Sequence, residues 1–145
     1  MALFLFTKAI VKNKPIDVYN MGNMQRDFTY IDDIIEGVIH VINKPAEENP
    51  DWTGENPDQA SSSAPYKLYN IGNSSPVMLT GFIDAIEDSL GKKAIKNLLP
   101  MQKGDIPATF ADVKDLVKNF DYKPNTSIKA GVAKFINWYN SFYKL

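Results

Sequence analysis

Three side chains in this sequence are of types that bind phosphate, aromatic and hydroxyl groups. Arg26 stands beside a glycine-containing turn, and its guanidinium presents a rigid fork of donors that matches phosphate oxygens. Tyr19 ends a short apolar–polar stretch, where its flat ring could stack on a base. Asp105 follows Gly104 in a tight loop, and its carboxylate could accept two hydrogen bonds from a ribose diol. Together these residues could hold a base, a ribose and a pyrophosphate.

Each of these residues also has a purely structural interpretation. Arg26 could pair with its neighbours Asp27 or Asp32, Tyr19 could belong to the core, and Asp105 could only stabilise its turn. The residue types by themselves leave both interpretations open.

Asp32 and Asp33 suggest acid–base or metal chemistry, but two carboxylates at a helix start also favour the helix dipole and cap free amides. His40 is the only histidine, and its apolar neighbours indicate packing or surface exposure rather than catalysis. The chain has no cysteine, which excludes disulfides, thiolate zinc sites and a cysteine nucleophile. We predict no catalytic residue and no metal ligand in this sequence.

The overall composition is that of an ordinary water-soluble domain. The 145 residues carry a net charge of −1, which argues against a general nucleic-acid or membrane-surface binder. The apolar opening residues end at Lys8 and lack a basic leader and a cleavage site, so they do not predict a signal peptide. We therefore expect a cytoplasmic protein.

Hydrophobic spacing and turn residues predict a mixed α+β fold in one domain, residues 1–145. Asp33 and Glu36 resemble a capping box, and Thr80, Asp112 and Thr126 are further expected helix starts. The expected helices cover residues 2–12, 33–43, 80–90, a short stretch after 112, and 126 onward. The expected strands cover residues 16–19, 28–31, 66–71 and 94–99. Prolines, acidic residues and serines in residues 44–65 predict a mobile surface loop between two of these elements.

Five segments, in order, resemble the C-terminal, substrate-binding part of an extended short-chain dehydrogenase/reductase. This part of such an enzyme does not include the Rossmann cofactor-binding core. The resemblance is to the NAD-dependent epimerase/dehydratase family, and within it to UDP-glucuronate 4-epimerases most closely. The segments are residues 14–19, the Arg-Asp-Phe-Thr-Tyr-Ile-Asp-Asp run at 26–33, residues 69–72, residues 102–112 and residues 120–126.

The resemblance implies a role for several residues in binding a UDP-sugar. Arg26 would bind the pyrophosphate, and the backbone around Asp17 and Tyr19 would read the uracil edge, with the Tyr19 ring nearby. Asn70 would lie close to the phosphates or the nucleotide, and Asp105 would hold the ribose hydroxyls.

Gln102 stands where many relatives of this family carry an arginine, three residues before the ribose-binding aspartate. The glucuronate epimerase branch is similar to this chain in having glutamine there. The glutamine therefore favours that branch, and it leaves open whether the phosphates have a second cationic contact.

Epimerases of this family use a tyrosine, a lysine four residues later, and bound NAD. The sequence has neither that pair in a suitable context nor the glycine-rich loop that holds the pyrophosphate of NAD. We therefore expect the chain to be a fragment of a longer enzyme, inactive alone. The N-terminal NAD-binding domain of the parent would be its missing partner, and this chain itself would bind no NAD.

Without that partner, apolar residues such as Ile34, Ile35 and Val38 should be exposed, and such patches promote self-association. We expect a dimer or higher oligomer. Two other functions remain open: a related nucleotide-sugar epimerase, dehydratase or decarboxylase fragment, and a non-catalytic nucleotide-sugar binding or interaction module.

Overall fold

The protein is described by a computed structural model that covers residues 2–145. These residues group into two units, between which the chain passes four times. Residues 2–28, 75–110 and 126–145 form the first unit, and residues 29–74 and 111–125 form the second. The mixture of helices and small sheets confirms the mixed α/β fold predicted from the sequence.

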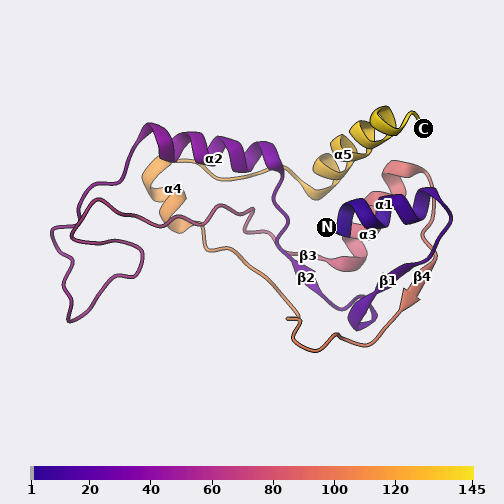
Figure 1. Cartoon of the computed structure of the whole chain (residues 1–145), viewed down its shortest axis with the longest axis horizontal. Coiled ribbons are helices and arrows are strands. Elements are labelled where there is room, and N and C mark those ends of the chain that lie inside the picture. Colours follow the sequence, from indigo (N-terminus) through magenta and orange to yellow (C-terminus); the bar gives the residue numbers. More distant parts are fainter. Residues whose placement is uncertain (1) are drawn as a thin grey trace. The chain divides into compact units, whose positions relative to one another are not determined.

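The first unit contains four helical elements and two small sheets (Figure 1). Its helices are α1 (Ala2–Val11), the short 3-10 turn η1 (Tyr19–Gly22), α3 (Leu79–Leu90) and α5 (Ile128–Tyr143). Its strands are β1 (Ile16–Val18), β2 (Gln25–Arg26), β3 (Val77–Met78) and β4 (Lys96–Leu98). β1 pairs with β4 in parallel, and β2 pairs with β3 in antiparallel orientation.

The core of the first unit lies where α1, α3 and α5 pack on β1. Ile16 and Val18 of β1 are buried and Asp17 between them is exposed, because successive side chains of a strand point to opposite faces. Burying an aliphatic or aromatic side chain of this size contributes about 1.5–3 kcal/mol. The other buried core residues come from the three helices and are Ile10, Phe82, Ile83, Ala85, Ile86, Val132 and Ile136.

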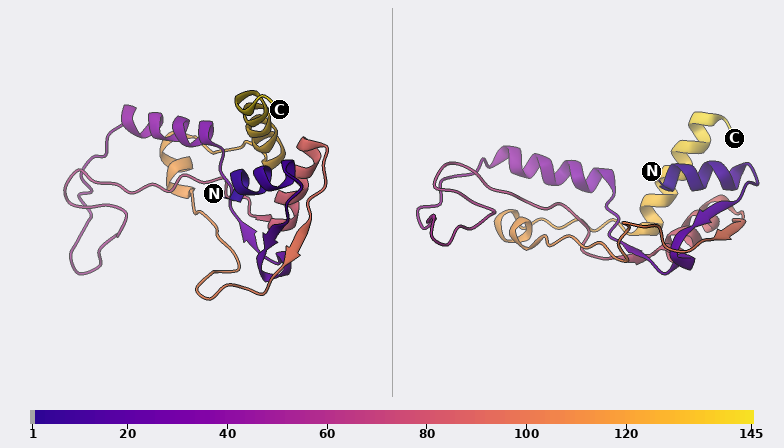
Figure 2. Two further views of the ribbon diagram at one scale, coloured as in Figure 1. Left: turned by 45° about the vertical axis from the view of Figure 1, so that its right-hand side comes forward. Right: turned by 60° about the horizontal axis from the view of Figure 1, so that its bottom comes forward.

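The second unit contains α2 (Ile31–Asn43), α4 (Lys114–Phe120) and the long excursion between α2 and β3 (Figure 2). α2 places Gly37 inside, where Ile71 and Tyr122 approach it closely. The Tyr122 hydroxyl donates to the Asp33 carbonyl at 2.7 Å, and burial together with the nearby Glu36 and Asp33 raises the pKa of Tyr122 to about 12.

Hydrogen bonds within residues 44–65 connect different parts of this segment to one another. The Asn49 N–H donates to the Ser62 carbonyl at 2.9 Å, and the Trp52 indole donates to the Asp58 carbonyl at 3.1 Å. The mobility expected for this segment stays a prediction.

Five sequence predictions of secondary structure are wrong in detail: two strands and three helix starts. Residues 28–31 and 66–71 form no strand: Ile31 begins α2, and the other residues lack regular structure apart from an isolated bridge between Ser61 and Lys67, because a strand needs a hydrogen-bonded neighbour along its length. α2 begins at Ile31 with Tyr30 as its N-cap, so Asp33 lies within the first turn. Similarly, Met78 rather than Thr80 precedes α3, and Ser127 rather than Thr126 caps α5 through the Ala130 N–H.

Among residues 2–145, none of the helices combines the length and the hydropathy that crossing a lipid bilayer requires.

Candidate functional site

Arg26 lies at the centre of three extended segments of the first unit. β2 pairs through Arg26 with Val77 of β3 on one side. On the other side, the Gln25 N–H donates to the Pro107 carbonyl at 2.8 Å and the Gln25 carbonyl accepts from the Thr109 N–H at 3.2 Å. These backbone bonds bring the loop that contains Asp105 beside Arg26, although the two residues are 79 positions apart.

The Arg26 guanidinium has different partners on its two terminal nitrogens. Nη1 donates to the Gln25 carbonyl at 2.8 Å and to the Pro107 carbonyl at 3.4 Å. Nη2 lies 2.8 Å from Oδ1 of Asp105, in an ion pair whose side chains are 25% and 33% exposed. The carbonyls fix the position of the side chain, and the carboxylate partly neutralises its charge.

Asp105 is oriented by the turn that the sequence predicted. Gly104 has a φ of +85°, which favours glycine, and the Asp105 N–H donates to the Gln102 carbonyl at 3.3 Å. Oδ1 of Asp105 also accepts the Ile106 N–H at 2.9 Å, so the same oxygen bonds the turn and Arg26.

Four of the six predicted site residues line one cavity of about 410 Å³ in the first unit: Asp17, Tyr19, Arg26 and Asp105. This volume lies within the range of small-molecule sites, about 300–1,000 Å³. The four residues come from β1, from the start of η1, from β2 and from the Gly104 turn. These charged and polar side chains could bind a ligand that carries both anionic groups and hydroxyl donors.

Asp17 lies in β1 and Tyr19 follows it at the start of η1. Because Ile16 and Val18 are buried, Asp17 points to the other face of the strand, where it is exposed, and Tyr19 is half-buried. Oδ1 of Asp17 accepts a hydrogen bond from Nδ2 of Asn97 at 2.8 Å, across the β1–β4 pair. Tyr19 therefore contributes a cavity wall rather than a core side chain.

The other two predicted site residues do not line this cavity. Gln102 is exposed at the start of the Gly104 turn, and its carbonyl accepts the Asp105 N–H. Asn70 belongs to the second unit, where its Nδ2 donates to the Asp112 carbonyl at 3.2 Å.

Sequence reasoning missed the apolar wall and two polar residues of the cavity, Asp27 and Thr109. Phe6 of α1 and Leu79 of α3 line it, and nothing in their local sequence distinguishes them from other core-facing residues. Thr109 also lines it, and its Oγ1 accepts the Asp27 N–H at 3.1 Å. Thr109 lies in the segment of residues 102–112 that carries the family resemblance, and this resemblance could have indicated Thr109 as a site residue.

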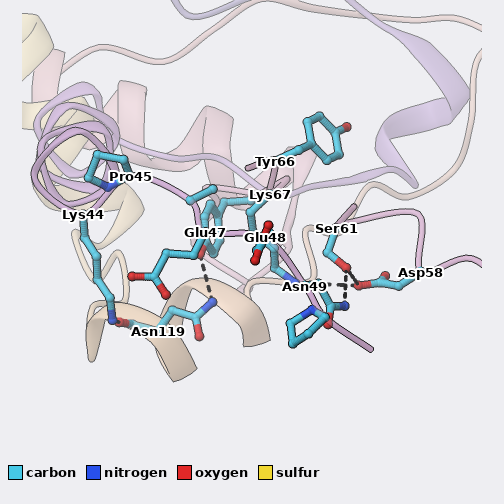
Figure 3. Close-up of a pocket in the computed structure, with 13 residues that line it drawn as sticks. Lys44, Pro45, Glu47, Glu48, Asn49, Asp58, Ser61, Tyr66, Lys67 and Asn119 are labelled. Carbon is cyan, nitrogen blue, oxygen red and sulfur yellow. Dashed lines mark hydrogen bonds and ion pairs between the residues drawn. The ribbon is translucent and has the colours of Figure 1, made fainter. Parts of the chain in front are cut away.

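A second hollow, of about 310 Å³, lies in the second unit beside residues 44–50 (Figure 3). Asp58 accepts hydrogen bonds from the Ser61 hydroxyl and from the Ala60 N–H, and these bonds lower the pKa of Asp58. Asn49 donates to the same Ser61 hydroxyl at 2.9 Å, as Figure 3 shows. The polar groups here bond one another and hold the long loop together.

The acidic pair and the histidine take structural roles. Asp32 and Asp33 both lie in the first turn of α2, where their charge favours the helix dipole. The His40 ring packs against the rings of Tyr122 and Phe120, with centroids 4.9 and 6.1 Å apart. Within the described part of the chain, no group of three or more His, Cys, Asp or Glu residues could hold a metal ion.

The connections into α2 and α3 lack the glycine-rich turn that would hold the pyrophosphate of NAD. Dinucleotide-binding folds hold it on a glycine-rich turn that leads from a strand into a helix. Here β3 runs directly into α3, and residues 27–30 between β2 and α2 contain no glycine.

Comparisons with known proteins give one consistent result. The model of the NAD dependent epimerase/dehydratase family matches residues 1–72. Protein CapI of Staphylococcus aureus is 57% identical over 99% of this chain, which covers 43% of that protein. A probable UDP-glucuronate 4-epimerase of Rhizobium meliloti is 43% identical over 99% of this chain, which covers 42% of that protein. The chain thus spans less than half the length of these relatives.

Among solved structures, UDP-glucuronic acid 4-epimerase of Bacillus cereus in complex with UDP-glucuronic acid and NAD superposes with a TM-score of 0.77 and 26% identity. The match covers 99% of this chain and 40% of that structure. The part matched is the C-terminal part of such enzymes, as the sequence resemblance implied.

Proposed function

This chain belongs to the NAD-dependent epimerase/dehydratase family, and we propose that it is the nucleotide-sugar-binding part of a UDP-glucuronate 4-epimerase. The observation that carries the proposal is the shared cavity. Asp105 is far in sequence from Asp17, Tyr19 and Arg26, and the fold of the first unit brings all four to one cavity. Their chemistry matches a uracil edge, a diphosphate and a ribose diol.

The complete enzyme would interconvert UDP-glucuronate and UDP-galacturonate with NAD. The names of the relatives support this proposal, as does the B. cereus enzyme, which was solved with UDP-glucuronic acid and NAD. Because no glycine-rich turn leads into α2 or α3, we propose that this chain alone holds neither cofactor nor activity. Assays of the 145-residue chain with UDP-glucuronate and NAD should give no UDP-galacturonate, and turnover would contradict the proposal.

The rest of the relatives' length is the proposed partner of this chain. α2 exposes an apolar stripe, defined by Ile31, Ile35, Val38, Ile39 and Ile42, each at least 39% exposed. In a complete enzyme this stripe would pack against the cofactor-binding part. Cytoplasmic location likewise stays a proposal, which cell fractionation tests.

Calorimetry with UDP tests the binding function. We expect Arg26→Ala to weaken UDP binding at least tenfold, because charge-assisted bonds to phosphate contribute about 1.5–3 kcal/mol. Arg26→Lys should recover part of the loss, since it keeps the charge and not the planar fork. Lys103→Ala is the matched control, because Lys103 is an exposed cation of the neighbouring turn that does not line the cavity.

Two outcomes would count against this function. If UDP does not bind the wild-type chain, the nucleotide site is not retained, and a non-catalytic interaction module becomes the better explanation. If UDP binds and Arg26→Ala binds it equally well, the cavity around Arg26 is not where the diphosphate lies.

A further inference from the structure

The cavity that contains Arg26 carries more negative than positive charge. Arg26 is the only arginine in the sequence. Among the described residues that line this cavity it is also the only cation, whereas Asp17, Asp27 and Asp105 are acidic. The resulting formal charge of −2 does not attract a free polyanion. A site with a net negative charge that binds phosphate therefore needs another interaction that favours its own ligand over other anions.

Asp105 is the carboxylate that engages the guanidinium directly. Its Oδ1 lies 2.8 Å from Nη2, while Nη1 is held by two backbone carbonyls. Both side chains are more than half shielded from solvent, which strengthens the pair relative to a fully exposed one. Any anion that binds Arg26 must therefore compete with Asp105 or lie beside it.

We propose that Asp105 suppresses the binding of bare phosphates at Arg26, so that the site selects a ligand that offers a diphosphate and a vicinal diol together. This inference rests on the proposed function. A nucleoside diphosphate gives phosphate oxygens to the guanidinium and hydroxyl donors to the carboxylate, so both charged groups keep a partner. Inorganic pyrophosphate satisfies only Arg26 and leaves the Asp105 carboxylate beside additional negative charge.

The neighbouring residues offer a matched pair of substitutions. Asp105→Asn removes the negative charge and keeps an Oδ1 that can accept the Ile106 N–H, so the turn is preserved. Asp17→Asn makes the same change of charge in the same cavity and keeps an acceptor for Asn97. Asp17 has no contact with Arg26 among the described residues, so the ion pair stays intact in this variant.

Calorimetric titration of the full 145-residue chain with pyrophosphate and with UDP, in metal-free buffer, tests the inference. We expect wild type to bind UDP at least tenfold more tightly than pyrophosphate. Asp105→Asn should bind pyrophosphate about tenfold more tightly than wild type, whereas Asp17→Asn should gain less than about threefold. An unchanged pyrophosphate affinity in Asp105→Asn, or an equal gain in Asp17→Asn, would overturn the inference.

The guanidinium gives a second measurement that needs no variant. Because Arg26 is the only arginine, its side-chain nitrogens are unambiguous in the NMR spectrum of a chain labelled with ¹⁵N-arginine. UDP should shift these signals, and pyrophosphate at the same concentration should not. Equal shifts with both ligands would overturn the inference. If pyrophosphate binding rises in Asp105→Asn but UDP binds no variant, the suppression by Asp105 is supported and the nucleotide function is contradicted.

Discussion

Glu87 is a buried carboxylate at the end of α3 that holds the segment leading into β4. Its side chain is 1% exposed, and its two oxygens lie 2.7 Å from Lys93 Nζ and 2.9 Å from Lys96 Nζ. Burial by itself raises the pKa of Glu87, but the bonds from Lys93, Lys96 and the Ala94 N–H outweigh it and lower the pKa to about 2. The charged form therefore stabilises the fold above pH 4.5, the ordinary pKa, and this stabilisation is lost as the pH falls towards 2.

We expect Glu87→Gln to lower the free energy of unfolding at pH 7 by on the order of 2 kcal/mol, and to lower it much less near pH 2.5. Urea denaturation at the two pH values measures the difference. Asp88→Asn, an exposed neighbour on the same helix, is the control and should have a small effect at both. An equal loss for Glu87→Gln at pH 7 and pH 2.5 would contradict the assignment of the stabilisation to the carboxylate charge.

Thr7 of α1 carries a buried hydroxyl with no hydrogen-bond partner among residues 2–145, and the residue is 0% exposed. Valine has nearly the same shape and no polar atom to leave unsatisfied. We expect Thr7→Val to raise the free energy of unfolding by about 1 kcal/mol, measured by urea denaturation. Thr7→Ser keeps the hydroxyl and loses a methyl group, so it should be destabilising, and a destabilised Thr7→Val would refute the interpretation.

In the candidate site, the sequence indicated individual residues but not the contacts between them. Arg26 and Asp105 could be chosen as candidate binding residues from their side-chain types, and both line one cavity, but the groups that they bind stay a prediction. Their pairing could not be predicted, because the sequence offered Asp27 and Asp32 as local partners, and the actual partner is 79 positions away. The distant pairing depends on the backbone bonds that Gln25 makes to residues 107–109, which no local pattern indicates.

At the scale of elements, α2 and α3 each contain a glycine, and the space around Gly37 of α2 is tighter than that around Gly81 of α3. A Cβ at Gly81 would meet only Val77 Cγ1, at an ordinary 3.5 Å. A Cβ at Gly37 would lie 3.1 Å from Ile71 Cδ1 and 3.3 Å from Tyr122 Cε1, which is crowded. Gly81→Ala should raise the free energy of unfolding by about 0.5–1 kcal/mol, because alanine is the better helix former.

Gly37→Ala is the contrasting variant. Its gain in helix propensity is opposed by displacement of Ile71 and Tyr122, so we expect no stabilisation and a loss of up to about 1 kcal/mol. Thermal unfolding of the two variants beside wild type measures both effects. A gain for Gly37→Ala as large as that for Gly81→Ala would show that the second unit relaxes around the new methyl group.

Helices were easier to predict than strands in this chain. Helix-forming residues, caps and amphipathic spacing together located the five α-helices of residues 2–145, because a helix makes its hydrogen bonds within one segment. A strand needs a partner, and residues 66–71 have a strand-like sequence without a ladder. β2 and β3 were not predicted. Each has only two residues, and their pairing depends on a contact between Arg26 and Val77, which are 51 positions apart.

At the scale of the whole molecule, the described residues form two units with interleaved segments, and the single domain expected from the sequence stays a prediction. The interleaving depends on long-range contacts, so hydrophobic periodicity does not reveal it. The family resemblance did predict an exposed apolar face on α2, because it implied a partner domain against which these residues would pack. Ile35 and Val38 are 51% and 39% exposed, as expected, whereas Ile34 is half-buried.

That stripe on α2 leads to a prediction about assembly. Ile31, Ile35, Ile39 and Ile42 are each more than half exposed and lie along one side of the helix, opposite the buried Gly37. Covering such a face removes apolar surface from water, so we expect the isolated 145-residue chain to self-associate. Light scattering after size-exclusion chromatography, over a range of concentrations, measures the mass.

Ile35→Lys combined with Ile39→Lys should weaken this association at least tenfold, because each buried isoleucine contributes about 1.5–3 kcal/mol and lysine resists burial. The control is Ile95→Lys combined with Leu98→Lys, which changes two residues of similar exposure, 55% and 54%, in the first unit. If the control variant dissociates as readily as the α2 variant, the association does not depend on the α2 stripe. A wild-type chain that stays monomeric at the highest concentration would show that this face needs no cover, which would also weaken its proposed role against the cofactor-binding part of the enzyme.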